Sequence, residues 1–318
     1  MSKRRLLRDS RYWHEFVLVV LLGGLLFFAW RAAPEFLLPQ SQIELSTQVW
    51  ELALLALPMT LIIITAGIDI SVGSTMALAA VVLGLTYEAG ISPWAGAAFA
   101  LLTGAAAGAL NGAFVVHVRV HPLIVTLATM AAYRGIAEGI SLGRPISGFP
   151  DSFAVIGRGS IGSLPIPCLI FLAALLVTAV ALGRTTFGRS LYAIGHNEAA
   201  SRFSGIPVDR IKLLLYTLSG TAAGMAAVMF VARRNTAKAD VGQGMELDVI
   251  TAVVLGGTSI FGGRGSVLGT LLGILLIHET REFVSWQWSK DEINLLVIGA
   301  VLIMSVLLNA LFSRKTCY

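Results

Sequence analysis

A few polar side chains interrupt long apolar stretches of this chain, and their chemistry is the most informative. Asp69 and Ser71 stand between two such stretches, while Asn111, Thr126 and Thr129 lie inside later ones. Carboxylate, amide and hydroxyl groups can hydrogen-bond a hydroxylated solute, but within a membrane they more often tie helices together. The set therefore indicates a solute pathway or gate, or else a packing network. Asp69 is also a suitable N-cap for a helix that starts near Ser71.

A glycine-rich run near the C-terminus is the second informative feature. Each glycine weakens a helix by roughly 1 kcal/mol relative to alanine, and irregular backbone at membrane depth must be covered by protein or line a cavity. The run therefore predicts a turn between packed helices first, and a pathway lining second. Its defining residues are Gly256, Gly257, Gly262, Gly263, Arg264 and Gly265.

The composition identifies the elements that must position these residues. Of 318 residues, 56% are hydrophobic and 13% are charged, against about 25% charged residues in an average soluble domain. This predicts an all-α, polytopic bundle of transmembrane helices with a single integral domain over 16–312. A basic cytoplasmic tail, 1–15, precedes it, and a short cytoplasmic tail, 313–318, follows. The net charge of +5 is spread over loops, which favours membrane topology and lipid contact over nucleic-acid binding.

Apolar segments of about 20 residues predict about ten helices. Two of them, 71–89 and 247–262, are short or interrupted by glycine, so they either cross fully or re-enter. The predicted helices are 16–33, 48–67, 71–89, 93–116, 122–142, 165–183, 211–232, 247–262, 265–285 and 292–312.

Lysine and arginine are more numerous on the side that holds the N-terminus, which predicts that both termini are cytoplasmic. Residues 66–74 and 256–269 are similar glycine-containing junctions between apolar segments. They indicate either an internal repeat of two halves with broken helices, as in many transporters, or two unrelated turns.

The longest internal cytoplasmic loop, 184–210, contains the signals of a short surface helix. Asn197 is a good N-cap, Glu198 suits the first turn, and Gly205 suits the left-handed C-terminal position. A helix over 198–204 could present an apolar face to a groove on a partner protein. The residues of this candidate docking segment are Gly195, Asn197, Glu198, Ala199, Ala200, Phe203 and Gly205.

Two helix-spacing patterns predict packing and not a site. Arg134 and Glu138 form a pair of opposite charge four residues apart, which we interpret as an interior ion pair. Gly104, Gly108 and Gly112 recur every four residues, which is typical of close helix packing in membranes.

The chain lacks the constellations of common enzymes. No cluster of titratable groups indicates a catalytic, cofactor or metal site, and Cys168 and Cys317 are too far apart in the predicted topology for a disulfide. None of the lysines directly follows a glycine in a phosphate-binding loop. If transport is driven by ATP, the ATPase must therefore be a separate protein.

Several strings resemble a known family. They are GIDISVG at 67–73, LNG at 110–112, TFGR at 186–189, YAIGHNEAA at 192–200 and VVLGGTSIFGG at 253–263. From about Val49 to Leu308 the chain resembles the permease subunits of bacterial ABC sugar importers. These importers are of the ribose, xylose, arabinose, rhamnose and autoinducer-2 type.

The resemblance implies a subunit of the bacterial inner membrane that imports a sugar or sugar-like solute without a cofactor. Its implied partners are an ABC ATPase subunit, a second permease copy or sister permease, and a periplasmic sugar-binding protein. It gives 184–210 the role of a coupling loop, with the predicted helix as coupling helix, and it does not distinguish among the sugars. A secondary transporter driven by an ion gradient remains the alternative, since broken helices and Asp69 would suit it as well.

Overall fold

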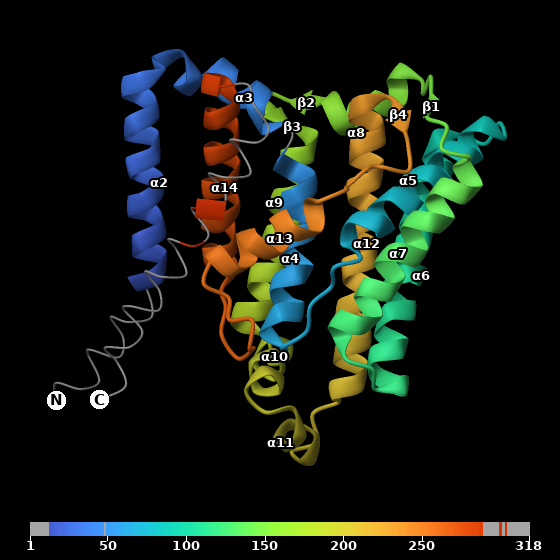
Figure 1. Cartoon of the computed structure of the whole chain (residues 1–318), viewed down its shortest axis with the longest axis vertical. Helices are drawn as coiled ribbons and strands as arrows, with labels where there is room; N and C mark the ends of the chain where they lie inside the picture. The colour runs from blue at the N-terminus through green and yellow to red at the C-terminus, as the bar shows by residue number, and fades with distance from the viewer. Residues whose placement is uncertain (1–12, 48, 289–298, 301–302, 304–318) are drawn as a thin grey trace.

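The structure is a computed structural model that describes residues 13–47, 49–288, 299, 300 and 303. It is a bundle of helices with two short two-stranded antiparallel sheets in the connections (Figure 1). The helices are α2 (Trp13–Ala32), η1 (Pro34–Leu37), α3 (Pro39–Ser46), α4 (Val49–Ile64), α5 (Val72–Glu88), α6 (Pro93–Ala113), η2 (Phe114–Val118), α7 (Pro122–Ser141), α8 (Asp151–Arg158), α9 (Ile166–Arg184), α10 (Thr186–His196), α11 (Glu198–Phe203), α12 (Val208–Arg234), α13 (Met245–Leu255) and α14 (Val267–Trp288). The strands are β1 (Ile146–Ser147), β2 (Ser160–Ile161), β3 (Leu164–Pro165) and β4 (Thr236–Ala237).

The predicted polytopic helical bundle is confirmed, because each predicted span up to 265–285 contains a helix. Five helices of the described part are long and apolar enough to cross a membrane alone, or six if α3 and α4 form one broken span. α14 is long enough but carries Glu279, Arg281 and Glu282 in its second half. The predicted span 292–312 lies outside the described residues apart from positions 299, 300 and 303, and so do residues 1–12 of the predicted N-terminal tail and all of the predicted C-terminal tail.

The two segments expected to be short are indeed short. α13 has 11 residues, or about 16 Å at 1.5 Å per residue, which is about half of a 30 Å hydrocarbon core. α5 has 17 residues. The connection from α4 climbs back along the bundle before α5 begins, and the chain from β4 descends before α13 begins (Figure 1). Both helices therefore start inside the bundle, where protein covers their ends.

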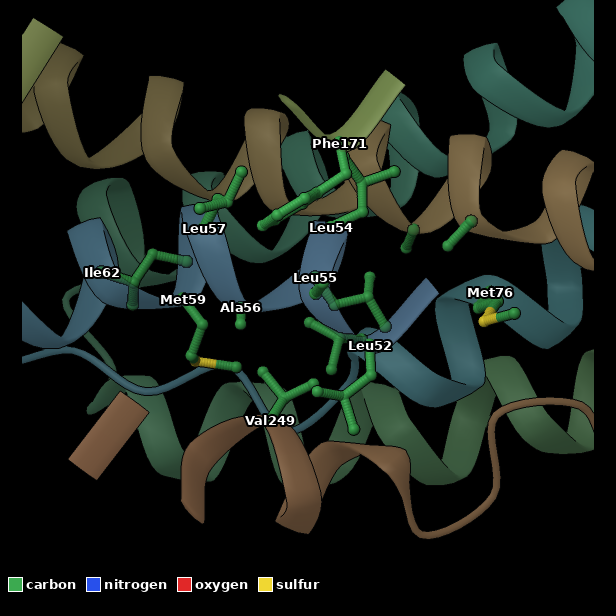
Figure 2. Close-up of a cluster of buried hydrophobic side chains, with 14 of the residues drawn as sticks. Leu52, Leu54, Leu55, Ala56, Leu57, Met59, Ile62, Met76, Phe171 and Val249 are labelled. Atoms are coloured by element: carbon green, nitrogen blue, oxygen red, sulfur yellow. The ribbon is translucent and has the colours of Figure 1, made fainter. Parts of the chain in front are cut away.

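α4 forms the centre of the bundle. Its sequence is apolar on every side, and all of its residues except Trp50 are buried. A helix with this pattern needs protein contacts all round. Figure 2 shows Leu52, Leu55 and Met59 of α4 among side chains of neighbouring elements, including Phe171 of α9 and Val249 of α13.

The glycine stripe of α6 packs against α12, as predicted. A Cβ on Gly104 would lie 2.2 Å from the carbonyl oxygen of Gly220, and one on Gly108 would lie 2.1 Å from that of Tyr216. A Cβ on Gly112 would lie 3.1 Å from Cα of Leu213, a less close approach. Only glycine allows the two backbones to approach this closely.

Replacing Gly108 with alanine is expected to destabilise the permease by about 1–3 kcal/mol, because the added methyl group forces α6 away from α12. The matched control is Gly24→Ala in α2, where no atom of the described residues lies within 4 Å of the added Cβ. That change should stabilise the helix slightly. Thermal unfolding of the two variants in lipid nanodiscs measures the difference, and equal midpoints would contradict the packing role of Gly108.

The bundle has two structurally different ends (Figure 1). At one end lie α3, α8 and the two small sheets, where β1 pairs antiparallel with β4 and connects the loop after α7 to the end of α12. At the other end lie α10, α11 and the glycine-rich turn between α13 and α14. We call the latter the α11 end.

Candidate functional site

A buried polar cluster connects the start of α5 with α6, α7 and α12. One carboxyl oxygen of Asp69 accepts hydrogen bonds from the Ser71 backbone N–H at 3.0 Å and from the Ser71 hydroxyl at 2.6 Å. The other accepts from the Ser219 hydroxyl at 2.8 Å. Asn111 donates to the Ser71 hydroxyl at 2.8 Å. Sequence prediction thus found three members of one network, Asp69, Ser71 and Asn111.

Asp69 is not the N-cap of α5, contrary to the prediction. Ser71 occupies the cap position and makes no side-chain cap bond. Asp69 instead accepts the backbone N–H two residues later, as in an Asx turn. Because Asp69 is 2% exposed, its carboxyl group orders the entry to α5 from inside the bundle.

Tyrosines of two helices complete the cluster, and sequence analysis did not identify them. The Tyr133 hydroxyl donates to Asn111 at 3.2 Å and to the Ala107 carbonyl at 2.9 Å. Tyr216 donates to the Ile68 carbonyl at 3.5 Å. A single tyrosine on an apolar helix carries no local signal that it bonds a distant residue.

The two threonines proposed with Asp69 have different roles. Thr126 donates to the Ile68 carbonyl at 3.3 Å as well as to its own helix, so it touches the segment that holds Asp69. Thr129 donates only to carbonyls of its own helix. The structure therefore brings Thr126 to the cluster and leaves Thr129 outside it.

Arg134 and Glu138 do not form the predicted interior ion pair. Glu138 is exposed, and Arg134 donates to the carbonyls of Ala239 and Val241, the latter at 2.9 Å. The guanidinium thus holds the descending segment before α13. Arg134 bonds these distant carbonyls and not the neighbouring carboxylate, because a half-buried guanidinium needs several acceptors at once.

At the α11 end, the predicted surface helix is present as α11. The Asn197 side chain accepts the Ala200 N–H at 2.9 Å, and Gly205 has a φ of +81°, as the capping signals predicted. Ala199 and Ala200 are exposed, and the Phe203 side chain is 93% exposed. The expected apolar face is therefore left uncovered by the residues that the structure describes.

Ion pairs hold α11 against the start of α12. Glu198 accepts from Arg202 at 2.9 Å and from Lys212 at 2.5 Å. Arg202 also donates to Asp209. Partial burial alone would raise the pKa of Glu198, but the hydrogen bonds from Lys212 and Arg202 lower it below its ordinary value. Glu198 is therefore ionised at neutral pH, and its pairs weaken only when the pH falls through that lowered pKa.

Gly195 lies at the end of α10, a helix that sequence analysis did not predict. A Cβ on Gly195 would lie 1.9 Å from the Ile64 carbonyl oxygen and 2.4 Å from the Gly263 nitrogen. The Gly263 N–H also donates to the Ile64 carbonyl at 2.9 Å. We call this meeting of Ile64, Gly195 and Gly263 the three-backbone junction. It joins α4, α10 and the glycine-rich turn.

The glycine-rich run forms the expected tight turn. The Gly262 N–H donates to the Ser259 carbonyl, and the Ser259 N–H donates to that of Arg264. Gly262 and Gly263 have φ angles of +83° and +74°, which favour glycine. The remaining glycines of the run serve close approach: Gly256 contacts the backbone of α14, Gly257 contacts His14, and Gly265 contacts Ile64.

The two junctions with similar sequences lie against each other. A Cβ on Gly262 would lie 2.9 Å from Cβ of Ala66, and the Tyr192 hydroxyl of α10 donates to the Gly265 carbonyl at 2.8 Å. Ala66 begins the connection that leads to Asp69. The glycine-rich turn, α10 and the connection to the polar cluster are thus continuous through direct contacts.

Comparison with known proteins identifies the family. Residues 42–306 match the family described as "Branched-chain amino acid transport system / permease component". The chain belongs to this permease family. The autoinducer 2 import system permease protein of Yersinia enterocolitica is 37% identical to this permease over 261 residues, which cover 80% of this chain and 79% of that protein. No solved structure matches the chain.

Two further relatives align with this permease over a larger share of both chains. The ribose import permease protein of Bacillus subtilis is 36% identical over 296 residues, or 92% of this chain and 90% of that protein. The autoinducer 2 import system permease protein of Photorhabdus laumondii is 36% identical over 304 residues, which cover 93% of this chain and 91% of that protein. The chain is thus a multi-pass membrane permease. Within the described residues no group of three or more His, Cys, Asp or Glu side chains could hold a metal ion.

Proposed function

We propose that this permease is the membrane subunit of an ATP-binding-cassette importer for a sugar or sugar-like solute. A separate ATPase drives it, a periplasmic binding protein supplies it, and a second permease subunit completes its pathway. Pentoses, deoxyhexoses and autoinducer-2 are the solute candidates. Two kinds of support exist: the relatives named for ribose and autoinducer 2 import, and the exposed apolar face of α11.

The exposed apolar face of α11 is the observation that supports an ATPase partner. An amphipathic helix that lays its apolar face into a groove is a common recognition mode. Phe203 is almost fully exposed, whereas the opposite side of α11 is attached to α12 through Glu198 and Lys212. A rigidly held helix that presents a phenylalanine to water is suited to receive a partner and to transmit its motion. A secondary transporter needs no such feature.

The remaining roles follow from this assignment. The α11 end is cytoplasmic, as are both termini, and residues 184–210 form the coupling loop. The glycine-rich turn and the three-backbone junction act as packing and hinge elements between the coupling loop and the interior. Asp69, Ser71, Asn111 and Thr126 set the position of α5 beside the pathway.

Uptake by the reconstituted transporter tests the proposal. The permease, its ATPase and its binding protein are placed in proteoliposomes, and uptake of D-ribose, D-xylose, L-arabinose, L-rhamnose and autoinducer-2 is measured. We expect uptake of one compound that requires ATP and the binding protein. Uptake that persists without ATP and collapses with an uncoupler would instead identify an ion-driven carrier.

Replacing Glu198 with lysine is expected to separate folding from coupling. The new ammonium group repels Arg202 and Lys212, so α11 loses its attachment to α12, while the bundle, which Glu198 does not enter, stays folded. Stimulation of ATP hydrolysis by the loaded binding protein should fall at least about tenfold, a cost of roughly 1.4 kcal/mol in coupling. Glu198→Gln, which removes the charge without reversing it, should show a smaller loss. Unchanged stimulation in Glu198→Lys would contradict the role of α11.

A further inference from the structure

A cavity of about 210 Å³ lies inside the bundle between α4, α12, α13 and α14. Its wall includes Glu51 of α4, Phe230 of α12 and Asp248 of α13. Arg233 and Arg234 also line a surface hollow next to Thr47 and Arg158, at the end opposite α11 (Figure 1). The cavity therefore reaches toward the face that the proposed topology turns to the periplasm.

Charged groups line this cavity from all four helices. Arg233 donates to Glu51 at 3.0 Å, and Arg281 of α14 pairs with Asp248 at 2.8 Å. The two pairs join α4 to α12 and α13 to α14. Charged side chains within a bundle of apolar helices are costly and are retained mostly where they face a cavity or carry out a function. Their presence distinguishes this cavity from a packing defect, which would be apolar.

One carboxyl oxygen of Glu51 has no partner. Oε1 accepts from Arg233, whereas Oε2 is buried and has no hydrogen-bond partner among the described residues. The residue is 2% exposed. Buried polar atoms are nearly always satisfied, and an exception needs an explanation such as a bound molecule. A hydroxyl group that donates to Oε2 inside the cavity would satisfy it.

Charge and size restrict the molecule that fits. The lining carboxylates are Glu51, Asp248 and Glu282, and the lining guanidiniums are Arg233, Arg234 and Arg281. Because these formal charges balance, an ionic solute would leave an unpaired charge, whereas a neutral hydroxyl can donate to a carboxylate and accept from a guanidinium. A volume of 210 Å³ equals about seven waters at ~30 Å³ each and lies below the roughly 300–1,000 Å³ of drug-sized ligand sites.

We propose that this cavity is a binding site, within a single permease chain, for a neutral polyhydroxylated solute of monosaccharide size, with Glu51 and Arg233 as its polar contacts. The proposal rests on the proposed function and deepens it, because it places a binding site for the transported solute between α4, α12, α13 and α14. The Phe230 ring supplies an apolar surface beside the two polar groups. Arg233 lies 5.7 Å from the centre of that ring, so the aromatic and polar sides of the site are adjacent.

The test uses a thiol placed in the cavity wall. Phe230→Cys is made in a permease carrying Cys168→Ser and Cys317→Ser, and the full transporter in lipid nanodiscs reacts with the charged reagent MTSET. Phe27→Cys is the matched control, because Phe27 lies at a similar distance from the end of lipid-exposed α2 and is 64% exposed there. A thiol in lipid stays protonated and unreactive. We expect Phe230→Cys to react at least about tenfold faster than the control.

Two further readouts connect the cavity to transport. The compound from the uptake panel that the wild-type transporter imports should slow the labelling of Phe230→Cys. Labelling of Met245→Cys, a lining position that is not assigned a contact with the solute, should abolish uptake of that compound. Equal labelling rates at Phe230→Cys and Phe27→Cys, or full uptake after labelling of Met245→Cys, would overturn the proposal. If Phe230→Cys does not assemble, Met245→Cys also carries the labelling measurements, because Met245 lines the same cavity.

The outcomes separate this proposal from the proposed function. A wild-type transporter that imports none of the panel compounds contradicts the proposed function, whatever the labelling rates are. A wild-type transporter that imports a sugar, together with a labelled and fully active Met245→Cys variant, contradicts the cavity site alone.

Discussion

Replacing Gly195 with valine is expected to lower ATP-driven uptake strongly while the permease still folds. The added side chain would occupy the space of the Ile64 carbonyl and the Gly263 nitrogen, so α10 must move away from both. Overpacking of this kind costs about 1–3 kcal/mol. If this free-energy cost destabilises the conformation that couples ATP hydrolysis to transport, the transport rate drops roughly 5–150-fold. Because no flexible side chain can give way, even Gly195→Ala should show part of the loss.

The measurement compares two activities of the same reconstituted transporter. Basal ATP hydrolysis should persist in Gly195→Val, while its stimulation by the loaded binding protein and the uptake of solute should fall together. Gly183→Val is the control, since Gly183 ends α9 near the same end of the bundle and nothing lies within 4 Å of its added Cβ. Wild-type uptake in Gly195→Val would show that the three-backbone junction does not transmit motion from the coupling loop to the interior of the bundle.

Replacing Asp69 with alanine is expected to have the largest effect on stability. The change leaves the Ser71 N–H and the hydroxyls of Ser71 and Ser219 without their acceptor, all inside the bundle. Each buried donor left unsatisfied costs about 1–3 kcal/mol. The variant should therefore unfold at a clearly lower temperature in nanodiscs and lose uptake with it.

Asp69→Asn separates a structural role from contact with the solute. The amide keeps an oxygen that accepts the Ser71 N–H, and the Ser219 hydroxyl can rotate to accept from the new NH₂ group. We expect Asp69→Asn to keep nearly wild-type thermal stability and most of the uptake. A variant that is stable but inactive would contradict this, and it would place the carboxylate in the solute pathway.

Local signals of the sequence predicted the features that depend on neighbouring residues. Asn197 and Gly205 define α11 because caps act within one turn. Gly104 and Gly108 define a packing stripe because small residues at helical spacing have few other uses in a membrane. The apolar segments likewise predicted the helices, and the low charge content predicted the membrane.

Pairings between residues far apart in sequence could not be predicted, because no local pattern indicates them. Glu51 and Arg233 are 182 residues apart, and each alone reads as a charge near a helix end. The i, i+4 pattern of Arg134 was misleading, since the carbonyl oxygens of Ala239 and Val241 compete for it only once the fold brings α13 close. The contact of Gly195 with Ile64 and Gly263 also depends on three segments meeting in space.

The burial of all of α4 except Trp50 has a consequence for how the permease responds to the thickness of its bilayer. α4 has 16 residues, or about 24 Å, which is shorter than a typical hydrocarbon core of about 30 Å. A lipid-facing helix of this length would suffer hydrophobic mismatch, but α4 is surrounded by protein. Changes in bilayer thickness should therefore be absorbed by tilting of peripheral helices such as α2, whose residues are mostly unburied. The axis of the bundle would keep its geometry in membranes of different thickness.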